Sequence, residues 1–248
     1  MEHLVIVGKG FGSGLAPQRP KLNRIIMGVN NVAMDQYADM IIDMHDLEWT
    51  EEECLKYYDH LREMFDEEEL KRRAKNRYDG FQGILQYVEF TNKSLLSIRK
   101  YKGLRSSMVY PLKAIIAHFD CDLFTSTVSY AIAWGLFNKF KRIDLYGINC
   151  VYAEEWAYQR EAIAHWLGVA RGMGVKTNVT GEEYRPLRSR HGLYGYNLPQ
   201  MDRGIETEDM WIAHKDQYGN PYQAKTKDDL VIKKRKVWLE GDVDDDFV

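Results

Sequence analysis

The chain has 248 residues, 45% of them hydrophobic, with 34 basic and 37 acidic side chains and a net charge of −3. This length and composition suit one large domain or a domain with an appendage, and the balanced charge gives no global electrostatic footprint for nucleic acid. No apolar run approaches the roughly 18 residues of a membrane span, so we expect no membrane partner. The three cysteines, an odd number without metal-ligand spacing, favour a reducing, cytoplasmic location over a disulfide framework.

Three short apolar runs near the N-terminus each predict a strand. HLVIVGKG begins as a buried strand and ends in glycines; RIIMGV, residues 24–29, ends at Asn30-Asn31; ADMIIDM, residues 38–44, ends at His45-Asp46. Short, fully apolar runs of this kind are typical of central strands in a parallel sheet. They predict a Rossmann-like start, with His45 and Asp46 as minor candidates for ligand contact.

Two helices are expected next. Thr50 and the three glutamates after it form a capping box, and helical spacing of apolar residues extends this helix to Phe65. The stretch 66–77 begins DEEEL and ends KRRAKNR, a polarity that matches the helix dipole. It indicates a solvated helix or, alternatively, a nucleic-acid contact.

The rest of the chain alternates between helix and strand as far as Thr180. Residues 112–119 are ambiguous by periodicity, and we favour a helix there. Further helices are expected over 126–139 and 155–173, the second ended by glycines, and strands over 143–148 and 176–180. We therefore predict an α/β, Rossmann-like three-layer domain with a mostly parallel sheet over residues 1–196. Residues 197–248 form an irregular C-terminal extension that wraps the domain or mediates homo-oligomer contacts, with a disordered end.

Alternating glycines follow the first strand, and we compared them with known phosphate-binding turns. No Gly-Lys-Ser/Thr closes the loop, so the Walker pattern is excluded, and Ser13 stands where a dinucleotide fold needs its third glycine. Two interpretations remain. Either the bare backbone approaches a nucleotide and Lys9 meets a phosphate, or this is a tight turn with an exposed lysine.

Together, a strand ending in a glycine turn, a second ending in Asn, a helix opened by Thr125-Ser126 and a strand ending in Gly-Ile-Asn resemble a known family. They are similar to the bacterial lipooligosaccharide sialyltransferases and their phage-encoded relatives, which are Rossmann-like glycosyltransferases. DLYGINC, EEWAYQR, HWLGVARGMGVK and LYGY resemble the phage relatives most. The resemblance covers about residues 4–196 and is strongest over 125–173.

The resemblance implies a set of donor-binding residues at the ends of the strands. It maps the donor nucleotide and sugar contacts onto Gly8, Lys9, Gly10, Asn30, Asn31, Thr125, Ser126 and Asn149. One departure is Lys9, because the family has Asn between the two turn glycines. A helix N-terminus with two hydroxyls suits an anionic or hydroxyl-rich ligand, although Ser126 could simply cap the helix.

The resemblance also implies catalytic residues. The family uses a histidine as the general base after the Gly-Ile-Asp strand, and its counterpart here is Glu154 or Glu155. Such a carboxylate could accept the proton of the acceptor hydroxyl. Alternatively, it could only stabilise the N-terminus of a helix through the helix dipole. His191 could close over the site. Tyr158, Gln159 and Arg160 could hold the leaving phosphate or lie on an exposed helix face. Without a DxD pair in the family position, we expect no metal and no cofactor beyond the nucleotide-sugar.

Two functions follow from these observations. The first is a glycosyltransferase that moves a sugar from a nucleotide-sugar to an acceptor hydroxyl, which could belong to a glycan, a protein or a hydroxymethylated base of phage DNA. DNA would require the basic segments 71–77, 99–105 and 233–236 to line one face. The second is a non-catalytic phage structural or nucleotide-binding accessory protein on the same scaffold.

Overall fold

The structure is a computed structural model that describes residues 2–10, 12–62, 65–148, 150 and 159–180. Contacts divide the chain into two units, Met1–Ile148 with Trp166–Thr180, and Asn149–His165 with Gly181–Val248. The predicted boundary at residue 197 stays a prediction. The sheet and helices below belong to the first unit, except for the first six residues of the last helix.

The core of the first unit is a seven-stranded sheet in the order β5-β4-β3-β2-β1-β6-β7, in which every pair is parallel. The strands are β1 (His3–Val7), β2 (Arg24–Val29), β3 (Met40–Asp43), β4 (Ser94–Ser97), β5 (Ser107–Val109), β6 (Arg142–Tyr146) and β7 (Lys176–Thr180). The strand order reverses at β1, which has β2 on one side and β6 on the other. The α/β fold with a parallel sheet is therefore confirmed.

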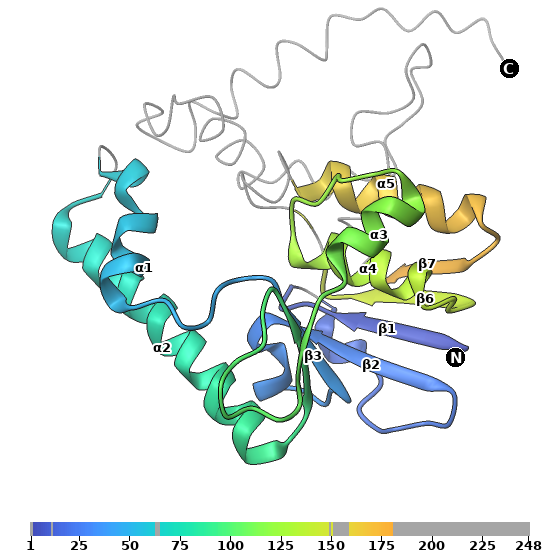
Figure 1. Ribbon diagram of the computed structural model, residues 1–248, viewed down its shortest axis with the longest axis horizontal. Helices are drawn as coiled ribbons and strands as arrows, with labels where there is room; N and C mark the ends of the chain where they lie inside the picture. Colours follow the sequence, from blue (N-terminus) through green and yellow to red (C-terminus); the bar gives the residue numbers. More distant parts are fainter. Residues whose placement is uncertain (1, 11, 63–64, 149, 151–158, 181–248) are drawn as a thin grey trace, which may run out of the picture. The chain divides into compact units, whose positions relative to one another are not determined.

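Helices cover both faces of this sheet (Figure 1). They are α1 (Glu51–Tyr57), α2 (Glu67–Thr91), α3 (Leu112–Phe119), α4 (Thr127–Phe137) and α5 (Arg160–Gly172), with 3-10 turns η1 (Ser13–Leu15), η2 (Asn30–Met34) and η3 (Asp59–Leu61). Phe81 of α2 shares a buried cluster with Ile41 and Leu95 on one face. Gly135 of α4 packs against Leu4 and Ile143, whose side chains point to the other face.

Two expectations about element boundaries were wrong. The Thr50 capping box is present, but α1 ends at Tyr57, and η3 follows where the helix was expected to continue to Phe65. Helix α2 continues beyond Arg77 to Thr91, because Phe81, Ile84 and Val88 continue its buried face. Helix α5 is described from Arg160, and its predicted start at residue 155 lies outside the described residues. The helix over 112–119 and the strand over 176–180 match their predictions.

Because all seven strands are parallel, their C-terminal ends meet at one edge of the sheet, which we call the carboxyl edge. Helix α4 precedes β6 and runs in the opposite direction, so its N-terminus lies at this edge too. In open α/β sheets, ligands bind outside this edge where the strand order reverses, which here is between β1 and β6.

Candidate active site

The turns after β1 and β6 pack directly against each other at the reversal of strand order. The Gly8 N–H donates to the Tyr146 carbonyl and the Gly10 N–H to the Gly147 carbonyl, both at 2.8 Å. Gly8 and Gly147 are buried, and neither has room for a side chain. Gly8, which was predicted to let the backbone approach a nucleotide, is thus already required by packing between two turns.

Lys9 points away from this packing and is exposed. Its ammonium lies 3.5 Å from the Asp35 carboxylate, and both side chains are more than half exposed. An exposed ion pair of this kind contributes about 0–1 kcal/mol, so a stronger anion could displace Asp35. The structure supports the interpretation of a tight turn with an exposed lysine, and leaves Lys9 able to reach a phosphate.

Asn30 is the first residue after β2 and adopts the left-handed conformation, with φ +55°. Asparagine tolerates this conformation better than most residues, and here it turns the chain into η2, which also contains Asn31. Its Oδ1 atom is buried and has no hydrogen-bond partner among the described residues. The pairing of Val29 with Ile42 places Asn30 beside Asp43, the last residue of β3.

Ser126 is the N-cap of α4, which is one of the two roles predicted for it, the other being contact with a ligand. Its hydroxyl accepts from the Ser129 N–H at 3.3 Å, and the Ser129 hydroxyl completes the capping box. The N–H groups of the first residues, Thr127 and Val128, have no carbonyl four residues back within the helix. These donors and the exposed Thr125 face the same edge as Asn30, so α4 supplies a place for an anion beside the β1 turn.

The end of β3 carries a histidine bonded to a buried carboxylate. Asp43 is fully buried, and its Oδ1 accepts from both the His45 backbone N–H, at 2.9 Å, and the His45 ring nitrogen Nδ1, at 2.7 Å. Asp43 Oδ2 is buried and has no partner in the described part of the chain. The His45 ring also packs on Phe81 of α2, with ring centroids 5.6 Å apart.

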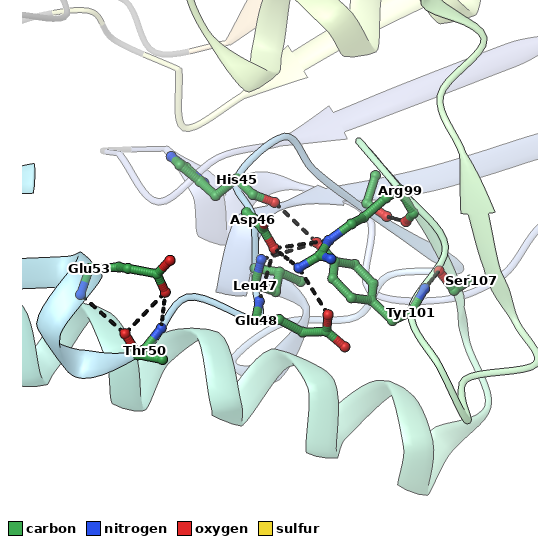
Figure 2. A network of polar contacts seen from close by, with 10 residues as sticks. His45, Asp46, Leu47, Glu48, Thr50, Glu53, Arg99, Tyr101 and Ser107 are labelled. Carbon is green, nitrogen blue, oxygen red and sulfur yellow. Dashed lines mark hydrogen bonds and ion pairs between the residues drawn. The ribbon is translucent and has the colours of Figure 1, made fainter.

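A buried tyrosine fixes the loop that follows His45. The Tyr101 hydroxyl donates to the His45 carbonyl at 3.2 Å and accepts from the Leu47 N–H at 3.0 Å. Burial raises the pKa of Tyr101, so its hydroxyl stays protonated and able to donate. Arg99 secures the same loop from outside by pairing with Asp46 and Glu48 (Figure 2). The main chain at His45 is thus held in place by residues more than fifty positions away.

A second Asp–His pair lies at the opposite edge of the sheet. Asp144 is buried in the middle of β6 and accepts from His3 Nε2 at 3.0 Å and from Arg142 at 2.8 Å. Burial lowers the pKa of His3, although Asp144 acts in the opposite direction. Because Arg142 compensates the charge of Asp144, this pair needs no further partner.

Several predicted site residues cannot be related to this edge. Glu154, Glu155, Tyr158, Asn149 and His191 lie outside the described residues. Gln159 and Arg160 are described, but they belong to the second unit, where Arg160 opens α5. Within the first unit, the turn at Gly8, Asn30 and the α4 cap share the carboxyl edge as predicted. The sequence analysis named His45 as a minor candidate but missed its partner, Asp43.

Of the three basic segments considered for DNA, 71–77 is largely engaged with acidic neighbours, and 233–236 lies outside the described residues. Lys71 pairs with Glu67, Arg72 and Arg73 with Glu69, and Lys75 with Asp79, all along α2. This arrangement matches the solvated helix among the two interpretations of 66–77. Among the described residues, no three His, Cys, Asp or Glu side chains form a metal-binding group, and no helix could cross a membrane.

Comparisons with known proteins give one structural likeness. No family model matches the sequence, and no curated protein matches it either. A solved structure of the sialyltransferase CstII from Campylobacter jejuni, in complex with a substrate analogue, cytidine-5′-monophosphate, is similar with a TM-score of 0.39 and 12% identity. The likeness covers 74% of this chain and 81% of that one. We therefore build the function on this chain's own residues.

Proposed function

We propose that this protein binds a nucleotide-sugar across the carboxyl edge, beside the β1–β6 reversal, and transfers the sugar to an acceptor hydroxyl. The observation that carries the proposal is that two neighbouring strands end in buried acceptor oxygens, Asn30 Oδ1 and Asp43 Oδ2, for which the described residues supply no donor. A buried acceptor left unpaired costs about 1–3 kcal/mol, so a ligand rich in hydroxyl or amino donors is favoured there.

The anionic part of such a ligand has its own place. The N-terminus of α4 offers backbone N–H groups that have no partner within the helix, together with the positive end of the helix dipole, and Lys9 lies in the turn after β1. The phosphate and donor contacts that the family resemblance implies for Asn149, Tyr158, Gln159 and Arg160 stay predictions. Catalysis would then depend mainly on positioning and on stabilising the leaving phosphate.

A second candidate is a nucleotide-binding protein without turnover. It is favoured by the Lys9–Asp35 ion pair, which engages the one cation of the glycine turn, and by the packing role of Gly8 and Gly147. Release of free nucleotide from a nucleotide-sugar separates the two candidates, since only a transferase or its hydrolytic side reaction produces it.

A thermal-shift series with free nucleotides and nucleotide-sugars tests the proposal. Ligand at about 100 times its Kd stabilises the folded chain by roughly 2.7 kcal/mol, which raises Tm by about 5–10 °C at this chain length. We expect one nucleotide family to give such a shift, followed by acceptor trials with glycans, proteins and hydroxymethylated DNA. The absence of a shift with every nucleotide would contradict the proposal.

A further inference from the structure

The Asp43–His45 pair is built as a proton-accepting group. A carboxylate only accepts hydrogen bonds, so the bond between Asp43 Oδ1 and His45 Nδ1 requires the proton to be on Nδ1. In the neutral ring the lone pair is therefore on Nε2. Among the described residues, no hydrogen-bond partner of Nε2 is present, and the side chain is 37% exposed. Nε2 is thus available to accept a proton from a molecule outside the fold.

Four contacts of the ring and main chain hold His45 in this state. Its Nδ1 and the backbone N–H are both bonded to Asp43, its carbonyl is bonded to Tyr101, and its face packs on Phe81. Among the described residues, the Asp46–Arg99 ion pair makes no hydrogen bond to the His45 ring. A base held in one orientation avoids the reorganisation that a free side chain would need at the moment of reaction.

Comparison with the pair at the other edge shows what is specific to His45. Asp144 is neutralised by Arg142, and His3 uses Nε2 for its bond to Asp144. Among the described residues, Asp43 pairs with no cation, and its bonds are to His45 alone. Its buried negative charge is therefore available to stabilise the imidazolium that forms when Nε2 takes a proton.

We propose that His45 is the general base of the transfer reaction and that Asp43 is its positioning residue, an inference that rests on the proposed function. The acceptor O–H gives its proton to His45 Nε2, and its oxygen forms the new bond to the anomeric carbon of the donor. The bond between that carbon and the nucleotide phosphate breaks, and the electron pair leaves with the phosphate. Since β3 lies two strands from β1, His45 is roughly 10 Å from the Gly8 turn, a span suited to an acceptor beside a donor sugar.

The test uses His45→Gln and Asp43→Asn in the full chain, with His3→Gln as the matched control at the opposite edge. Free nucleotide released from CMP-, UDP- and GDP-sugars is measured beside binding of the corresponding nucleotides. We expect His45→Gln to bind nucleotide as the wild type does and to release it on the order of 10²–10⁴-fold more slowly. Asp43→Asn should also be slowed, because a neutral amide cannot stabilise the imidazolium that forms when Nε2 takes a proton, whereas His3→Gln should keep the wild-type rate.

If the wild-type chain releases nucleotide and His45→Gln releases it at the same rate, this inference is overturned and the proposed function stands. Failure of the wild-type chain to release nucleotide from any donor would overturn both. NMR of isotope-labelled histidine in the unsubstituted chain gives a result that does not depend on how the variants fold. We expect the proton of neutral His45 on Nδ1, and a proton found on Nε2 would contradict the assignment.

Discussion

Gly8 and Gly147 lie so close across the β1–β6 boundary that a methyl group on either would clash with the other's carbonyl oxygen. A Cβ on Gly8 would lie 2.6 Å from the Gly147 oxygen, and a Cβ on Gly147 would lie 2.5 Å from the Gly8 oxygen. Both obstacles are backbone atoms, so no side-chain rotation relieves them. Gly147 also has φ +62°, which a residue with a Cβ rarely adopts. The reversal of strand order is therefore built on a pair of residues that must both be glycine.

We expect Gly147→Ala to lower the free energy of unfolding by about 2–4 kcal/mol, because overpacking adds to left-handed strain. Gly103→Ala isolates the strain, since Gly103 has φ +87° and nothing within 4 Å of its Cβ position, and should cost about 1 kcal/mol. Gly14→Ala introduces neither overpacking nor left-handed strain, so its free energy of unfolding should stay within about 0.5 kcal/mol of the wild type. Urea unfolding measures all three. Equal losses in the Gly147 and Gly103 variants would contradict the close approach.

Ser126→Asp should separate the capping role of Ser126 from ligand binding. Aspartate caps helices as well as serine does, so stability should stay within about 0.5 kcal/mol. Its negative charge at the α4 N-terminus should repel a phosphate and weaken nucleotide binding by about tenfold or more. Thr50→Asp, the same change at the α1 cap, is the control. Calorimetric binding in which both variants match the wild type would exclude α4 as the phosphate position.

The stability of the protein should fall as the pH drops below the ordinary histidine value of 6.5, in part because of His3. Burial lowers the pKa of folded His3, and Arg142 and Arg24 act in the same direction against Asp144. The unfolded chain then takes up the proton more readily than the folded chain. The stability that neutral His3 contributes is therefore complete above pH 6.5, and it is lost as the pH falls toward the lowered pKa of the folded state. Denaturation of His3→Gln across this window should show a weaker pH dependence. A steeper dependence in the variant would contradict the direction of the shift.

Tyr101→Phe should loosen the loop that positions His45. The change leaves the His45 carbonyl and the Leu47 N–H without the Tyr101 hydroxyl, at a cost of about 1–3 kcal/mol. Tyr110→Phe is the matched control, since it removes another hydroxyl bond of a buried tyrosine, to the Tyr130 carbonyl, away from that loop. We expect both variants to lose stability and only Tyr101→Phe to slow nucleotide release. Equal rates of nucleotide release in the Tyr101→Phe and Tyr110→Phe variants would show that the loop does not position His45.

Much of the fold could be predicted because its signals are local. The apolar run over 24–29 matches β2 residue for residue, and the capping boxes at Thr50 and Ser126 are both formed. Strands β4 and β5 were missed, since four and three residues are too short to establish a period. The length of α2 was also missed, because Gly80 and Gly83 lie inside it; at Gly83 a Cβ would lie 3.1 Å from Met34, so a tertiary contact accounts for that glycine.

Residues could be placed at the carboxyl edge from the sequence only where they follow an apolar run or cap a helix. Asn30 and Ser126 could be placed at the carboxyl edge from apolar runs and caps alone. The sequence IIDMH contains Asp43 and His45, but nothing local indicates that the strand ends at Asp43 or that its carboxylate is buried. Tyr101, which fixes His45, comes from a loop after a strand that sequence reasoning did not identify. Contacts this remote depend on the assembled sheet.

The central claim, a nucleotide-sugar site at the carboxyl edge, is tested most directly by mapping backbone amide NMR shifts during a nucleotide titration. We predict that the amides of Gly8, Asn30 and Thr127 shift together with one saturation curve, while those of His3 and Lys176 at the opposite edge do not. Saturable shifts confined to the opposite edge, or no shifts with any nucleotide, would contradict the account.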